Sequence, residues 1–172
     1  MMAAEFARLL RRLPIFASLG PEEAVELATR CTGLRYRPGM RIFTEGEFAD
    51  NVMIIVNGSV QISCAVPDGP DLVIATEGAG VLLGEMALLD PAPRSASATA
   101  VEETTVLVMD GQHFHELVAI GHPAATGILR TIGLLTCARM RRLEAQVDQL
   151  LTGDPTGDLA SRIDTALRGL GP

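Results

Sequence analysis

The sequence lacks tryptophan and lysine altogether, and aromatic residues make up only 3 % of its 172 positions. A core must therefore be built mainly from Leu, Val, Ile, Ala and Met. The scarcity of aromatic rings argues against a protein that stacks nucleic-acid bases on aromatic side chains. With 48 % hydrophobic residues, a chain of this length should form one folded domain with some appended helix.

Positive charge is also in short supply. All 14 basic residues are arginine, the net charge is −7 at pH 7, and the isoelectric point is about 4.9. A protein that neutralises the phosphate backbone of DNA normally carries a basic patch. We therefore expect no DNA binding from this chain.

Cysteines and long apolar runs are few as well. Cys31, Cys64 and Cys137 lie too far apart for a zinc or iron–sulfur site, so we expect reduced thiols and no metal. The N-terminal residues mix acids and arginines without the apolar centre of a signal peptide. No run approaches the roughly 18 apolar residues that a membrane span needs. The sequence thus predicts a cytoplasmic protein without a membrane segment.

Helical patterns occupy the first part of the chain. Residues 3–13 predict one short helix and residues 21–33 a second. Within the second helix, Val25, Leu27 and Ala28 are predicted to face the core.

The pattern then changes to short strands separated by glycine-rich turns. Asn57-Gly58 is the strongest hairpin signal, and the strand after it alternates with Val60, Ile62 and Cys64 on one face. Such closely spaced strands are typical of an antiparallel barrel or sandwich. The predicted strands are 41–44, 52–56, 59–66, 72–76, 97–101 and 104–109.

Helical periodicity returns after the last strand. Asp110 suits the N-cap of a short helix, and Pro123 begins a longer helix that ends near Leu151. The predicted fold class is α+β: an antiparallel β-roll, a jelly-roll-like double-stranded β-helix, flanked by N-terminal helices and a long C-terminal helix. The expected organisation is N-terminal helices in 1–33, the roll with the C-terminal helices in 34–151, and a short tail, 152–172, whose pattern allows a helix.

One segment inside the β-region carries the chemistry: GEMALLDPAPRSAS, residues 84–97. Its first six residues predict a helical turn or two, whose N-terminal N–H groups suit an anion. Gly84 allows close approach of the backbone, and Glu85 brings a carboxylate that accepts from hydroxyl groups. Arg94 adds a planar cation suited to phosphate, with the Ser95 hydroxyl beside it. A 3′,5′-cyclic nucleotide, with one phosphate charge and a free ribose hydroxyl, fits this combination.

This segment resembles the phosphate-binding cassette of the cyclic nucleotide-binding family, of the type in catabolite activator protein and protein kinase A regulatory subunits. Upstream, PGMRIFTEGEFADNVMIIVNGSVQI resembles the family's opening hairpins, with glycines at Gly39, Gly46 and Gly58. The resemblance runs from about Leu13 to Leu150. It implies a non-catalytic regulatory module that binds cAMP or cGMP and responds by movement of its C-terminal helices.

The resemblance also implies functions for particular residues. Glu85 would accept from the ribose 2′-OH and Arg94 would pair with the cyclic phosphate. Ser95 directly after the arginine, where threonine tends to accompany guanine preference, favours cAMP over cGMP. The full set of expected ligand-binding residues is Leu83, Gly84, Glu85, Met86, Ala87, Arg94, Ser95, Ala96 and Arg139.

Other interpretations stay open at this point. Glu85 could be only an acid in a first helical turn, with Arg94 as its ion-pair partner. The cassette could also be silent and serve as an interaction or dimerisation domain, or the chain could be a fragment of a larger regulator. DNA binding in the family needs a helix-turn-helix module, and only about twenty residues follow the long helix.

Two further patterns bear on partners and metals. Met140, Leu143, Val147 and Leu150 form a short a/d seam in the long helix, which predicts a homodimer through that helix. His113 and His115 form an HxH pair like that of a cupin metal site. They follow the Asp110 cap, however, and side chains two positions apart on a helix diverge by about 200°. We therefore expect neither a metal site nor an enzyme.

Overall fold

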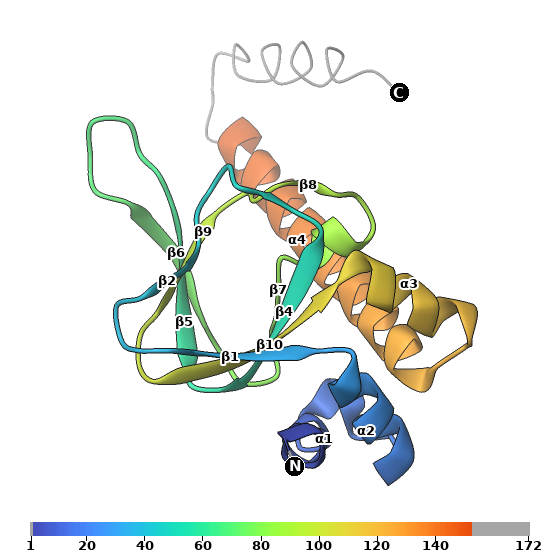
Figure 1. Cartoon of the computed structure of the whole chain (residues 1–172). Helices are drawn as coiled ribbons and strands as arrows, with labels where there is room; N and C mark the ends of the chain where they lie inside the picture. Colours follow the sequence, from blue (N-terminus) through green and yellow to red (C-terminus); the bar gives the residue numbers. More distant parts are fainter. Residues whose placement is uncertain (1, 153–172) are drawn as a thin grey trace. The chain divides into compact units, whose positions relative to one another are not determined.

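The computed structural model describes residues 2–152, which form an antiparallel β-roll with helices before and after it (Figure 1). The predicted fold class is therefore confirmed. In chain order the elements are α1 (Met2–Leu10), η1 (Pro14–Phe16), α2 (Pro21–Thr29), β1 (Thr32–Tyr36), β2 (Arg41–Phe43), β3 (Phe48–Ala49), β4 (Asn51–Asn57), β5 (Ser59–Cys64), β6 (Leu72–Gly78), β7 (Leu82–Leu83), η2 (Glu85–Leu88), β8 (Ala92–Pro93), β9 (Ser97–Ala100), β10 (Thr104–Asp110), α3 (Gly111–Ala119) and α4 (Pro123–Thr152).

Two four-stranded sheets make the roll, in the orders β1-β10-β4-β7 and β2-β9-β5-β6, and β3 pairs with β8 in a small third sheet. Every strand pair is antiparallel. Side chains from both large sheets meet in one interior cluster, in which the only aromatic ring among the fully buried members is that of Phe43. This aliphatic interior agrees with the composition. The cluster consists of Phe43, Met53, Ile55, Val60, Leu83, Ala98 and Val106.

Helix α2 packs one of its faces on the core. In α2 the buried residues are Ala24, Leu27 and Ala28, which are spaced i, i+3 and i+4. Val25 is exposed, so its predicted inward position is wrong. It lies about 100° around the helix from Ala24, which takes the core position instead.

The strands differ from the sequence expectation in several places, and the short strands β3, β7 and β8 are not predicted. Strand β1 is not predicted, because its residues show no clean apolar alternation, and it pairs with the distant β10. In β6 the pairing with β5 shifts: Ile62 pairs with Ala75 and Ser63 with Val73, so Ile74 is the extra residue of a bulge in β6. The pairing of β5 with β9 continues without a shift. In β5 Ser63 is buried, whereas Cys64 is only half-buried.

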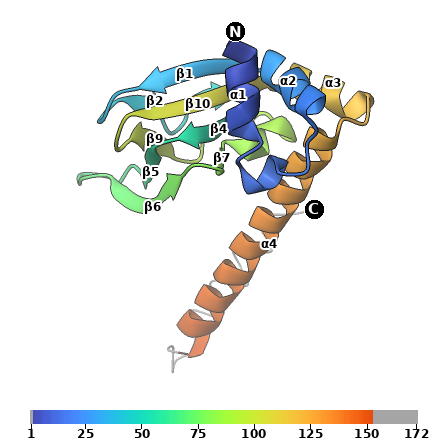
Figure 2. The same ribbon diagram turned by 90° about the horizontal axis from the view of Figure 1, so that it is seen from below.

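Helix α3 closes the end of the roll next to α2, as Figure 2 shows. The Asp110 carboxylate accepts from the backbone N–H of His113, so the predicted N-cap is confirmed. Phe114 and Leu117 are the buried residues of α3.

The chain divides into two compact units after Thr131, a position within α4, so this helix contributes to both units. We describe each unit by itself. Met140 is exposed, whereas the side chains of Leu143 and Leu150 lie outside the described part, so the seam stays a prediction. The predicted tail helix lies in 153–172, outside the described residues.

In residues 2–152 no single helix is long and apolar enough to cross a membrane. Helix α3 and the first part of α4 reach that length and apolar content only as a pair, and the pair is bent by 116°.

We predict that Phe114→Ala lowers the free energy of unfolding by about 3–5 kcal/mol, because this ring is only 1 % exposed. Val118→Ala on the same helix is the matched control, since Val118 is 42 % exposed and its loss should cost less than about 0.5 kcal/mol. Urea unfolding of the two variants measures both values, and similar losses would contradict the placement of α3.

We also predict that Cys31 resists thiol reagents in the native chain. Burial, and then the charge of Asp110, raises the pKa of this thiol to about 12, so almost no thiolate forms at pH 8. Labelling of native and unfolded protein followed by peptide mapping measures this. Rapid modification of Cys31 in the native chain at pH 8 would show that it is not shielded.

Candidate functional site

The predicted site segment leaves one large sheet and returns to the other. Leu83 pairs with Met53 at the edge of the first sheet, and the chain then enters η2, the short helix that the sequence predicts. It returns through β8, which pairs with β3, and enters β9 in the second sheet. Arg94 lies directly after β8. Ten residues apart in sequence, Gly84 and Arg94 thus meet at one place.

Gly84 is required at this place for two reasons. Its backbone has φ +67°, which side-chain-bearing residues rarely adopt. A Cβ atom built there would lie 1.7 Å from Nη1 of Arg94. The carbonyl oxygen of Gly84 accepts from the same Nη1 at 3.3 Å. The glycine therefore makes room for the guanidinium and helps to hold it.

Asn51, the first residue of β4, holds the guanidinium from the other side. Its backbone oxygen accepts from Nη1 of Arg94 at 3.1 Å, and its Oδ1 accepts from Nη2 at 2.7 Å. The ring of Phe43 lies 4.5 Å from Cζ of the guanidinium, within cation–π range. The backbone of Arg94 is fixed as well: its N–H donates to Glu47 and its carbonyl accepts from Gly46, both at 2.8 Å.

This arginine is a buried cation, with only 6 % of its surface exposed. Burial lowers the pKa of the Arg94 guanidinium, and the negative charges of Glu47, Glu85 and Asp50 partly offset that effect. Arginine keeps its charge under such shifts. Its Nε is buried and has no hydrogen-bond partner among the described residues. A buried cation with a buried N–H donor that has no partner can bind an anion favourably, because the anion replaces the hydration that burial removes.

The other residues expected to bind ligand surround this arginine to different degrees. Glu85 is 4 % exposed and its charge acts on Arg94. The N–H of Ala87, another expected ligand-binding residue, donates to the Gly84 carbonyl at 3.2 Å at the start of η2. Met86 is exposed, and so is Ser95, whose backbone oxygen accepts from Sγ of Cys64 at 3.5 Å.

The remaining expected residues are Leu83, Ala96 and Arg139. Leu83 belongs to the interior cluster of the roll rather than to the polar contacts. Ala96 is half-buried in the link between Arg94 and β9. Arg139 lies on α4, but its side chain is outside the described part of the structure.

Sequence reasoning missed Asn51 and Phe43. Asn51 precedes the apolar run of β4, and a polar residue at a strand start is an ordinary turn signal. Phe43 lies on β2 and looks like any core aromatic. Both act on Arg94 across more than forty positions of sequence, so no local pattern reveals the contact.

The HxH pair takes part in local contacts. His113 and His115 lie on α3, as predicted. Nδ1 of His113 is 3.0 Å from the Asp110 carboxylate, and the ring of His115 is tilted against Phe114. Within residues 2–152 no group of three His, Cys, Asp or Glu side chains is placed to hold a metal ion.

Comparison with known proteins decides the family. Residues 34–120 match the family described as the cyclic nucleotide-binding domain, and they include β2 to α3 and the whole of the site segment. The chain belongs to the cyclic nucleotide-binding domain family. Its buried arginine and short helix therefore lie in a domain type whose ligands are cyclic nucleotides.

Relatives of this cyclic nucleotide-binding domain include transcription regulators. The chain is 32 % identical over 161 residues to the "Cyclic AMP receptor protein" of Thermus thermophilus, covering 92 % of this chain and 72 % of the relative. It is 28 % identical over 155 residues to a "CRP-like cAMP-activated global transcriptional regulator" of Mycobacterium tuberculosis, covering 90 % and 67 %. The solved structure of the Thermus thermophilus catabolite activator protein is similar with a TM-score of 0.68 at 30 % identity, covering 80 % of this chain and 62 % of that one.

We predict that Gly84→Ala destabilises the domain more than Gly39→Ala does. Both glycines have positive φ, but a Cβ on Gly39 meets nothing within 4 Å. Gly39→Ala should therefore cost only the backbone strain, about 1–2 kcal/mol. Gly84→Ala should cost a further 1–3 kcal/mol or so, because Arg94 must give up a hydrogen bond. Urea unfolding measures the difference, and equal losses would show that Gly84 makes no room for the arginine.

Proposed function

We propose that this chain binds one cyclic nucleotide, cAMP in preference to cGMP, and acts as a regulatory sensor without catalysis. The observation that carries the proposal is the buried guanidinium of Arg94, whose Nε lacks a hydrogen-bond partner among the described residues. A buried cation with a donor to spare supports the binding of a singly charged phosphodiester.

In this proposal the cyclic phosphate lies against Arg94. Asn51 keeps the guanidinium plane oriented through Oδ1, 2.7 Å from Nη2, so that the remaining N–H groups are directed to the anion. The N–H and the hydroxyl of Ser95 would also face the phosphate, and the Ala87 N–H would join them by leaving the Gly84 carbonyl. Leu83, Gly84, Met86 and Ala96 are the other proposed ligand contacts.

The ribose would be held by Glu85. This carboxylate lies at the start of η2 and is 4 % exposed. A carboxylate accepts hydrogen bonds from hydroxyl groups. The free 2′-OH of a 3′,5′-cyclic nucleotide is such a donor, whereas a 2′-deoxy analogue offers none.

Two observations support cAMP over cGMP. Position 95 after the arginine is serine rather than threonine. Two relatives, the regulator of Mycobacterium tuberculosis and the receptor protein of Thermus thermophilus, are named for cAMP. Arg139 on α4 remains the proposed additional contact to the nucleotide from the C-terminal helix.

The response would be a shift of the C-terminal helices. If nucleotide binds more tightly to the conformation in which η2 and these helices lie closer, ligand shifts the population toward it. The proposal further includes a roll-and-helix ligand unit in 34–151 preceded by helices in 1–33, a homodimer through α4, no DNA binding by this chain itself, and a cytoplasmic location.

We predict that Arg94→Ala weakens cAMP binding by about 100-fold or more. Two charge-assisted hydrogen bonds are lost, each contributing roughly 1.5–3 kcal/mol. Isothermal titration of ligand-stripped protein with cAMP and then cGMP measures the affinities of parent and variant. Arg35→Ala is the matched control, because Arg35 is an exposed arginine on β1 and should leave both affinities unchanged.

Circular dichroism must show that the Arg94→Ala variant is folded. Unchanged affinity in a folded variant would contradict the phosphate assignment. A parent chain that binds neither nucleotide would contradict the sensor function and would indicate a silent cassette.

A further inference from the structure

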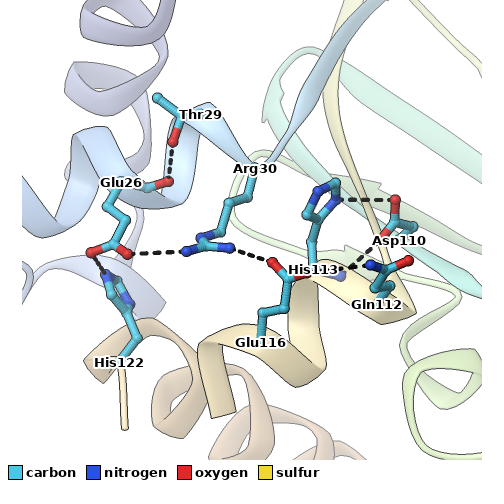
Figure 3. Close-up of polar contacts among 8 residues, drawn as sticks. All are labelled: Glu26, Thr29, Arg30, Asp110, Gln112, His113, Glu116 and His122. Atoms are coloured by element: carbon cyan, nitrogen blue, oxygen red, sulfur yellow. Dashed lines mark hydrogen bonds and ion pairs between the residues drawn. The ribbon is translucent and has the colours of Figure 1, made fainter. Parts of the chain in front are cut away.

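A series of polar contacts connects α2, α3 and the residue before α4, as Figure 3 shows. We call this series the polar chain; its four side chains are those of Glu116, Arg30, Glu26 and His122. Arg30, which caps the C-terminus of α2, lies between two carboxylates. Its Nη2 is 3.2 Å from Oε1 of Glu26 on α2, and its Nη1 is 2.6 Å from Oε2 of Glu116 on α3. Oε2 of Glu26 in turn lies 3.6 Å from Nε2 of His122. None of these residues belongs to the proposed ligand contacts.

His122 directly precedes Pro123, the first residue of α4. Its Nδ1 accepts from the backbone N–H of Ala124 at 3.1 Å, and its carbonyl accepts from the N–H of Ala125 at 3.0 Å. The imidazole therefore acts as the N-cap of α4, satisfying N–H groups that a helix start leaves without partners. The side chain is also buried, since the residue is only 4 % exposed.

The cap determines the protonation pattern of the ring. Because Nδ1 of His122 accepts a hydrogen bond, the proton of the neutral ring is on Nε2. That N–H faces the Glu26 carboxylate, and no closer partner of Nε2 exists among the described residues. One ring thus contacts α4 through one nitrogen and faces α2 through the other.

Arg30 carries the connection onward to α3. Its side chain is about one-quarter exposed, so its pairs are less screened than those of a fully exposed arginine. Its contact with Glu116 joins residues 86 positions apart. Helix α3 itself packs against η2, the short helix of the proposed ligand site.

We propose that helix α2 is a second connection between the ligand site and the start of α4, with Arg30 and His122 as its positioning residues. This inference rests on the proposed function. The covalent path from α3 to α4 is the short turn at Ile120, Gly121 and His122. The polar chain runs beside it, from η2 through α3 and Glu116 to Arg30, Glu26 and the cap of α4. A shift of α3 on nucleotide binding is then transmitted to α2 and to the first turns of α4 together.

The first test needs no ligand. Arg30→Met removes both ion pairs and keeps much of the apolar stem, and we expect amide exchange in residues 123–131 to become about tenfold faster, as the loss of a charge-assisted hydrogen bond implies. Arg35→Met, on an exposed arginine of β1, is the matched control and should leave exchange unchanged. If amide exchange in residues 123–131 is as slow in Arg30→Met as in the parent, the proposed connection through α2 is wrong.

The cap has its own test. Nitrogen NMR should show the His122 ring, assigned by the loss of its signals in His122→Asn, with its proton on Nε2. Asn can cap α4 as His122 does, but it cannot reach Glu26. We therefore expect His122→Asn to retain the folded helix yet lose the ligand response of α2, whereas His122→Ala should destabilise α4 as well. A His122 ring with its proton on Nδ1 would contradict the assignment of this ring as the N-cap of α4.

The ligand test uses hydrogen exchange with and without saturating cAMP. In the parent, cAMP should slow exchange in residues 84–96, and should also change exchange in 21–30 and 123–131. In Arg30→Met the effect at 84–96 should remain, while the effect at 21–30 should be lost. A parent that shows the effect at 84–96 alone would overturn the inference. A parent with no effect anywhere would contradict the proposed function, and the ligand-free comparison would still decide whether α2 is connected to α4.

Discussion

The site depends on the placement of one buried cation, the guanidinium of Arg94. Taking a charge out of water is costly unless nearby groups replace the lost hydration. Here the replacements come from separate strands and turns: the Asn51 oxygens, the Gly84 carbonyl and the ring of Phe43. The start of β4, the left-handed turn before η2 and the inner face of β2 must therefore all be in place for the arginine to be held.

Those partners leave the cation only partly compensated. The net effect of burial is to lower the pKa of Arg94, although Glu47, Glu85 and Asp50 act against it, and its Nε has no partner among the described residues. An incoming phosphate would supply a further negative charge and an acceptor for Nε at once. In the proposed function the energy of binding thus comes from a group that the fold has already oriented, so little ordering is required when ligand arrives.

Local signals were enough to predict much of the molecule. The Asn57-Gly58 turn, the Asp110 cap and the short helix at Glu85 depend on residues close in sequence, and each occurs where the pattern places it. Pairings between distant segments were not predictable in this way. Strand β1 is defined only by its pairing with β10, and the bulge at Ile74 appears only where β6 pairs with β5.

The site residues that the sequence predicts are close together in the chain, whereas those that it does not predict act through contacts between distant positions. Gly84, Glu85 and Arg94 share one short segment, so chemistry and family resemblance both indicated them. Asn51 contacts Arg94 across 43 positions, and Arg30 contacts Glu116 across 86. An asparagine at a strand start and an arginine at a helix end are common surface residues, and only the folded chain distinguishes them from others of their kind.

A crystal structure of the chain with cAMP would show whether Arg94 is held ready for a cyclic phosphate. We expect phosphate oxygens within hydrogen-bond distance of the Arg94 guanidinium, the 2′-OH on the Glu85 carboxylate, and Asn51 still beside the arginine. A nucleotide bound elsewhere, with Arg94 contacting only Asn51 and Gly84, would contradict this placement of the phosphate.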